Sequence, residues 1–303
     1  MKEIIDMKTV NDYGLRVGHA AQHPLISFIN LSDHQYQPGA RALTLRFNFY
    51  AIFLKKGTDC VLKYGRKNYD YQEGTLIFMA PGQVVDIRDD GKEYQPSGLV
   101  LLFHPDLLRG TPLASEMPNY SFFSYEVNEA LHLSEKEESI IKDCFSKIDF
   151  ELSQGIDKHS KKLLVSNVEL LLNYCARFYD RQFITRADVE HDNIIHKFES
   201  LIHTYFAEGM AEKEGLPTVS LFADNMHLSP NYFGDLIKKQ TGKTAQDHIQ
   251  DKIIDIAKNK IFDPGKSVSQ IAYELGFKYP QHFTRLFKKK TGHSPNTYRT
   301  YLN

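Results

Sequence analysis

The C-terminal third of the chain repeats a pattern of about 50 residues, and this repeat limits the possible folds more than any other feature. The first copy runs from Ser220 to Ile249 and the second from Ser269 to Arg299. Aligned with one inserted residue, both copies carry an alanine, a proline, a phenylalanine, a Lys-Lys pair and a Thr-Gly pair at matching positions. We conclude that this region contains one supersecondary unit twice.

Each copy predicts a short helix, a tight turn and a second helix. Pro230 and Pro280 suit the first position of the second helix, where a missing N–H costs nothing, and Ser229 can cap the helix that follows it. Gly242 and Gly292 then end these helices. The start and the end of both second helices are therefore marked in the sequence.

Small residues predict close packing within each copy. Ala223 and Ala272 allow the two helices to cross closely, and Gly276 suits the sharp turn of the second copy. The segment between the copies, from about Gln246 to Ile261, predicts a helix that spans about 24 Å at 1.5 Å per residue. Such a helix would hold the two copies at a fixed separation.

The second helices divide into an apolar face and a polar face. Phe233, Leu236 and Ile237 recur at helical spacing and face the core, which leaves polar and charged residues outward. This is the layout of a helix-turn-helix, whose second helix places its early residues at base edges in the major groove and its basic residues near phosphates. The alternative is a plain helical bundle with a solvated charged face, and two copies of the pattern count against it. The predicted DNA-binding residues are Ser229, Asn231, Tyr232, Asp235, Lys238, Lys239, Tyr279, Gln281, His282, Thr284, Arg285, Lys288 and Lys289.

The charge of the chain is distributed unevenly. The formal net charge is -1, yet residues 216–303 hold 13 Lys and Arg against 7 Asp and Glu, and residues 1–215 hold 24 against 31. A basic C-terminal block on an acidic remainder favours a phosphate-bearing partner for one half of the chain only.

Residues 193–303 resemble the DNA-binding domain of the AraC-type (AraC/XylS family) transcription regulators, most clearly from Ile271 to Arg299. The resemblance implies two helix-turn-helix units joined by a central helix, double-stranded DNA as a partner, and activation or sometimes repression of transcription beside RNA polymerase. One departure is Asp235, which follows Gly234 where the family often has an arginine. An acid repels phosphate but can accept a hydrogen bond from cytosine. We expect the second unit to be the stronger reader of DNA.

The N-terminal part of the chain predicts β-strands. Apolar and polar residues alternate from Leu43 to Phe49, and further short apolar segments follow, separated by turn-rich stretches. This spacing favours a small antiparallel barrel or sandwich. The region also resembles, more loosely, the cupin-like sensor domain of the same family, in the strand and turn from Gly74 to Gly82. We therefore assign a cupin-like β-barrel sensor domain to residues 1–133.

Two amphipathic helices are expected in residues 134–181. Ser134 and Glu137 form a capping box at the start of the first helix, and the second begins near Asp157. The apolar stripe of the second helix is broad enough to pack on the barrel and on a second subunit, although core packing alone also accounts for it. We assign residues 134–181 to a helical dimerisation segment of a homodimer and residues 182–192 to a linker.

Aromatic and cationic residues of the predicted barrel form a candidate ligand site. Polar small molecules such as sugars stack on aromatic faces and bond to guanidinium groups, although strand packing explains the same residues. The candidate ligand-binding residues are Arg46, Tyr50, Tyr64, Tyr69 and Tyr71. The His-x-His and glutamate set of metal-binding cupin enzymes is not visible, so we expect no metal, no cofactor and no enzymatic activity.

Together these observations predict a multi-domain α and β protein: a cupin-like β-barrel with two following helices, then an all-α domain with two helix-turn-helix units. No apolar run of about 18 residues occurs, and charges interrupt the first ten residues, so we expect a cytoplasmic protein without a membrane partner. The predicted function is that of a sequence-specific transcriptional regulator, a dimeric activator responding to a small-molecule effector. The alternatives are a cupin-type small-molecule enzyme with an appended DNA-binding domain and a regulator controlled by a protein partner.

Overall fold

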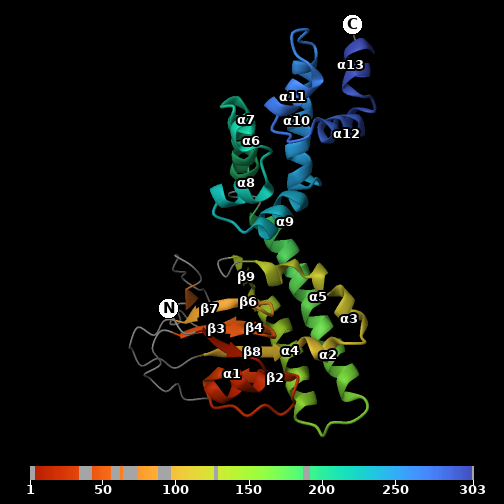
Figure 1. Ribbon diagram of the computed structural model, residues 1–303. Helices are drawn as coiled ribbons and strands as arrows, with labels where there is room; N and C mark the ends of the chain where they lie inside the picture. Colours follow the sequence, from red (N-terminus) through yellow and green to blue (C-terminus); the bar gives the residue numbers. More distant parts are fainter. Residues whose placement is uncertain are drawn as a thin grey trace. The chain divides into compact units, whose positions relative to one another are not determined.

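The computed structural model describes residues 4–33, 43–55, 62–63, 74–87, 97–125, 129–186 and 192–301 (Figure 1). The chain divides into two compact units, Met1–Gln182 and Phe183–Asn303. Helix α5 (Ser160–Arg186) continues past this division, so a helix occupies residues 182–186 of the predicted linker. Residues 187–191 of that linker lie outside the described residues.

The strands of the first unit form two sheets. The first sheet has the order β1-β3-β7-β5 and the second the order β2-β8-β4-β6-β9. Paired strands are antiparallel except β1 and β3, which are parallel. The strands are β1 (Ile4–Met7), β2 (Ile26–Asn30), β3 (Leu43–Phe47), β4 (Tyr50–Lys55), β5 (Leu62–Lys63), β6 (Thr75–Met79), β7 (Val84–Ile87), β8 (Gly98–Phe103) and β9 (Leu131–His132).

The predicted β-structure is confirmed, but the predicted closed barrel is not. Among the described strands no pairing joins one sheet to the other, so both sheets are open. Leu45 and Phe47 from the first sheet share one apolar core with Phe53, Ile77 and Leu102 from the second. Because two packed sheets bury their inner faces as well as a barrel does, the alternating pattern alone does not decide between these architectures.

Helices cover the outer face of the five-stranded sheet. Helix α4 (Glu135–Leu152) packs on β2, where the rings of Phe28 and Phe145 lie 5.7 Å apart between centroids. The predicted capping box at its start is confirmed, because the Ser134 and Glu137 side chains each accept from the other residue's backbone N–H. The remaining helical elements of this unit are α1 (Val10–Arg16), η1 (Leu31–Asp33), α2 (Pro105–Leu108), α3 (Pro112–Glu116), η2 (Met117–Asn119) and η3 (Ser121–Ser124).

The second unit is helical throughout the described residues. Its core is built around Phe198, Phe222, Phe233, Phe283 and Phe287, which are all buried. Its helices are α6 (Asp192–Ala207), α7 (Met210–Glu214), α8 (Val219–Asn225), α9 (Pro230–Thr241), α10 (Ala245–Ile261), α11 (Val268–Glu274), α12 (Pro280–Thr291) and α13 (Pro295–Tyr301). Within the described parts of both units, no helix is both long enough and apolar enough to span a membrane.

Candidate nucleic-acid interface

The sequence repeat corresponds to two helix-turn-helix units, α8 with α9 and α11 with α12, connected by α10 (Figure 1). Their turns have the same backbone geometry. Leu228 N donates to the Ala223 carbonyl at 3.0 Å, and Phe277 N donates to the Ala272 carbonyl at 3.0 Å. Both alanines are fully buried. The burial of both alanines agrees with the prediction that small residues let the two helices of each unit pack together.

The turns reach the same conformation with different residues. Gly276 has φ +89°, and a Cβ at this position would lie 2.6 Å from the Gly215 carbonyl carbon and 2.8 Å from the Ala211 oxygen. The matching residue of the first helix-turn-helix unit is His227, which adopts φ +59°. Glycine is therefore required in the second turn by both its conformation and its surroundings.

The second helices begin and end as the sequence predicts. Ser229 caps α9 by accepting from Tyr232 N at 3.3 Å, and prolines occupy the first helical positions of α9 and α12. Both helices stop at a glycine in the left-handed region, Gly242 with φ +73° and Gly292 with φ +83°.

Helix α12 exposes most of the side chains that the sequence assigns to DNA. Gln281, His282, Arg285, Lys288 and Lys289 are exposed, whereas Thr284 is half-buried. Tyr279, directly before the helix, is 55% exposed, and its ring lies 5.6 Å from that of His282. A surface hollow of about 300 Å³ is lined by His282, Arg285, Leu286 and Lys289. The outward face is thus cationic, which suits contact with phosphates.

Helix α9 presents fewer of its predicted residues. Asn231, Lys238 and Lys239 are exposed, and Asp235 is half-buried. Ser229 and Tyr232 are buried, the former as the helix cap. The Tyr232 ring packs 5.2 Å from that of Phe183. These two side chains contribute to packing and helix capping at α9.

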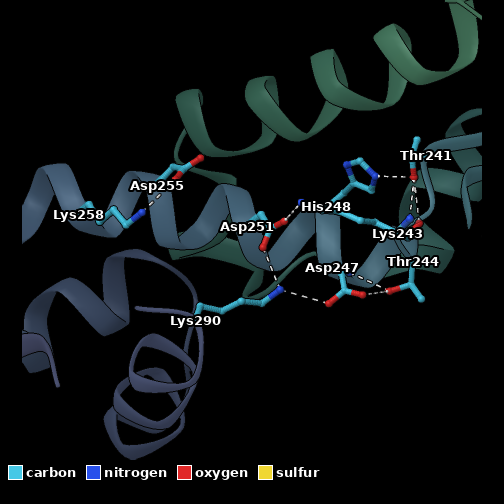
Figure 2. A network of polar contacts seen from close by, with 9 residues as sticks. All are labelled: Thr241, Lys243, Thr244, Asp247, His248, Asp251, Asp255, Lys258 and Lys290. Atoms are coloured by element: carbon cyan, nitrogen blue, oxygen red, sulfur yellow. Dashed lines mark hydrogen bonds and ion pairs between the residues drawn. The ribbon is translucent and has the colours of Figure 1, made fainter. Parts of the chain in front are cut away.

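Sequence reasoning missed an ionic network on α10 (Figure 2). The Lys290 ammonium at the end of α12 donates to Asp251 at 2.9 Å and to Asp247 at 3.2 Å. The hydrogen bond to Asp251 raises the pKa of Lys290 despite the opposing effect of burial. The pKa of Asp247 is lowered by hydrogen bonds from Thr244 and Lys290. For Asp251, burial raises the pKa, but hydrogen bonds from Lys290 and Lys243 outweigh it and the pKa is lowered.

A second missed residue is Arg299, on α13. Its Nε donates to the Ile261 carbonyl at 2.6 Å and its Nη2 donates to the Lys266 carbonyl at 2.8 Å. A guanidinium at the end of a helix satisfies carbonyls that have no intrahelical partner. The sequence signal was its place at the end of the second repeat, but its role is to hold α13 against the end of α10.

Two of the candidate ligand residues, Arg46 and Tyr50, lie within the part of the chain that the structure describes. Arg46 pairs with Asp6 at 3.4 Å, and both side chains are exposed. The Tyr50 ring stacks on Phe103 at 5.0 Å, and burial raises the pKa of its hydroxyl. Neither residue belongs to the apolar core between the sheets. The other candidates, Tyr64, Tyr69 and Tyr71, lie outside the described residues.

Known proteins match mainly this C-terminal region. A family model described as a helix-turn-helix domain matches residues 222–301. The uncharacterized HTH-type transcriptional regulator YobQ of Bacillus subtilis is 32% identical over 109 residues, which are 35% of this chain and 42% of YobQ. A solved structure of a probable AraC family transcriptional regulator from Rhodopseudomonas palustris covers 36% of this chain and 96% of its own, at 17% identity and a TM-score of 0.31. This chain carries an AraC/XylS-type helix-turn-helix domain.

The matched residues 222–301 lie within the unit Phe183–Asn303 and include α9, α11, α12 and the last four residues of α8. The bifunctional transcriptional activator/DNA repair enzyme AdaA of B. subtilis is also similar, at 33% identity over 99 residues, which are 33% of this chain and 46% of AdaA. The chain thus covers less than half the length of either curated relative. The family resemblance expected from the sequence is confirmed for the AraC/XylS-type domain.

Proposed function

We propose that this protein is a sequence-specific, DNA-binding transcriptional regulator that reads DNA with α9 and α12. The observation that carries the proposal is the outward face of α12, where exposed polar and cationic side chains occupy one side while Phe283 and Phe287 are fully buried on the other. A recognition helix needs this division, because one face must be fixed to the domain while the other enters the major groove.

The side chains of α12 support two kinds of contact. Gln281, His282, Thr284 and Arg285 lie in the first half of the helix and are assigned to base edges, since early residues of a recognition helix reach the groove floor. Lys288 and Lys289 lie near its end and are assigned to phosphates, which fix the register without reading sequence.

The spacing of the two units supports simultaneous binding. Helix α10 has 17 residues, which rise about 26 Å at 1.5 Å per residue. Successive major grooves on one face of DNA lie about 34 Å apart. A separator of this length allows α9 and α12 to enter neighbouring grooves of one duplex.

The test is selection of binding sites by the full chain from a pool of random duplex DNA, followed by affinity measurement on the enriched duplexes at several salt concentrations. Enrichment of a motif that covers two adjacent major-groove segments supports the proposal. Salt-sensitive binding without an enriched motif would overturn it, because phosphate contacts alone give sequence-independent affinity.

The proposal extends to a cytoplasmic homodimer that activates transcription beside RNA polymerase. Apolar side chains exposed on and between α4 and α5 support dimerisation, with Phe150 and Ile156 each 67% exposed and Leu163 and Leu170 also exposed. Exposed apolar residues in the assigned segment 134–181 lose contact with water when two subunits associate. Sedimentation of the full chain and of a Leu163→Glu, Leu170→Glu variant tests this, and an unchanged mass would count against the dimer.

The proposal also includes a small-molecule effector that binds the first unit. Its support is the organisation of the chain, in which 182 residues form a separate compact unit outside the AraC/XylS-type domain. A bound effector stabilises the folded state in proportion to its occupancy, so a thermal-shift screen of sugars and other polar metabolites is the test. A screen without stabilisation, together with capture of a stoichiometric protein partner, would instead support control by that partner.

A further inference from the structure

Three consecutive lysines end helix α12, and the structure separates their roles. Lys288 and Lys289 are exposed on the outward face. The side chain of Lys290 is only 21% exposed and points to α10, where its ammonium lies between Asp247 and Asp251 (Figure 2). Lys290 directly follows the two lysines that the sequence assigns to DNA, but its ammonium pairs with carboxylates of the same domain.

The acceptors of Lys290 are themselves held in place. Asp247 and Asp251 lie four residues apart on α10, so they occupy one face of that helix. Asp251 also accepts from Lys243 at 2.9 Å, and Asp247 accepts from the Thr244 hydroxyl at 2.7 Å. Thr244 is the N-cap of α10. Lys290 therefore binds carboxylates whose positions are set by the start of α10.

Two other titratable groups on α10 have partners of their own. The His248 ring contacts the Thr241 hydroxyl at 2.9 Å, and Asp255 pairs with Lys258 at 3.7 Å (Figure 2). Among the described residues, Lys290 makes the ion pairs that join α12 to α10, and the two helices also share an apolar core. The matching residue of the first helix-turn-helix unit is Gln240, which carries no charge. This ionic contact is therefore a feature of the second helix-turn-helix unit.

The location of the contact determines what it can control. Phe283 and Phe287 anchor one side of α12 in the apolar core. Two hydrogen bonds from Lys290 to fixed carboxylates further restrict rotation of α12 about its axis and tilt of its C-terminal end. Because base contacts depend on hydrogen-bond geometry, a small rotation of α12 displaces Arg285 from the groove floor.

We infer that Lys290 is a positioning residue for sequence reading, which acts by fixing α12 on α10 through Asp247 and Asp251 and does not bind a phosphate. The inference rests on the proposed function. It separates Lys290 from the adjacent Lys289, which provides a matched control.

The experiment compares full-length Lys290→Gln, Lys290→Arg, Lys289→Gln, Asp251→Asn and the Lys290→Gln, Asp251→Asn double variant. Affinity for a random-sequence duplex is measured across salt concentrations. Discrimination at a half-site is defined as the affinity for the enriched duplex divided by the affinity for the same duplex with that half-site scrambled. The half-site read by α12 is the one whose discrimination falls in Arg285→Ala.

For Lys290→Gln we expect an unchanged salt slope and about a fivefold loss of discrimination at the α12 half-site, a size that matches one to two partly exposed charged hydrogen bonds. Discrimination at the other half-site stays constant. Lys290→Arg restores discrimination because it keeps the charge. Asp251→Asn reproduces the loss without weakening binding to the random duplex, and the double variant loses no more than either single variant.

Lys289→Gln should behave in the opposite way, with a salt slope reduced by about 0.9 and discrimination unchanged. If Lys290→Gln shows this phosphate pattern, the inference is wrong. An equal loss of discrimination at both half-sites would also overturn it, because general destabilisation would then explain the effect. Failure to enrich any motif would overturn the proposed function itself, which is distinguishable from both results.

Discussion

The turn of the second helix-turn-helix unit offers a stringent test of the fold, through the substitution Gly276→Ala. The backbone at this position has φ +89°, where a side chain costs about 1–2 kcal/mol. The new Cβ would also meet backbone atoms of Gly215 and Ala211 at 2.6–2.8 Å. Backbone atoms cannot move aside as a flexible side chain can, and such overpacking costs about 1–3 kcal/mol.

Together these costs predict a loss of about 2–5 kcal/mol in the free energy of unfolding of the compact unit Phe183–Asn303. Urea unfolding of the full chain measures the loss. Hydrogen exchange of the α11 and α12 amides then assigns the loss to the compact unit Phe183–Asn303. Because α12 follows this turn, discrimination at its half-site should fall as well. The amides of the compact unit Met1–Gln182 should keep their protection from hydrogen exchange.

His227→Gly is the matched control in the first turn. The substitution removes the cost of a side chain at φ +59°, but a glycine also raises the backbone entropy of the unfolded chain. The free energy of unfolding should therefore rise by no more than about 0.5 kcal/mol. If Gly276→Ala costs less than about 0.5 kcal/mol, the close contact between the turn and the segment after α7 does not exist in solution, and the reasoning is refuted.

Three further predictions concern charge on the second unit. Arg285→Ala should cost about 1–3 kcal/mol in specific DNA binding if its guanidinium reaches a guanine, and an unchanged specificity profile would contradict that assignment. Neutralising Lys288 and Lys289 together should weaken binding to all duplexes alike and reduce the salt slope by about 1.8, whereas a sequence-selective loss would argue against phosphate contacts. The lowered pKa values of Asp247 and Asp251 mean that their contribution to stability is complete above the unfolded-state value of about 3.9. That contribution is lost as the pH falls through the lower folded-state values, so acid titration of Asp251→Asn should show a smaller loss of stability than that of the unsubstituted protein.

Local signals in the sequence predicted the helix-turn-helix units closely. Pro230, Ser229 and Gly242 act within a few residues of the backbone groups they control, so their presence in the sequence specifies helix starts and ends directly. The capping box of Ser134 and Glu137 was predictable for the same reason.

Long-range pairing was not predictable in the same way. Lys290 contacts residues 39 and 43 positions away, and nothing in the run of three lysines indicates that the third turns inward. The alternation from Leu43 to Phe49 predicts a strand but not which strands lie at the sheet edges, so closure into a barrel could not be derived from it. Tyr50 shows the same limit, because its packing on Phe103 depends on a strand paired to it from far along the chain.

The repeat also explains why the two recognition helices should differ in function although they share a fold. Selection for the fold acts on the buried face and on the helix ends, and these match between the copies in the proline that starts each second helix and in the threonine and glycine that end it. The outward faces are free of that requirement and have diverged. Arg285 in α12 aligns in the repeat with Asp235 in α9. An arginine adds attraction to any duplex and a bidentate contact to guanine, whereas an aspartate lowers affinity everywhere except where it accepts from cytosine. If both helices bind, α12 should supply most of the affinity and α9 should act mainly by excluding unsuitable sequences.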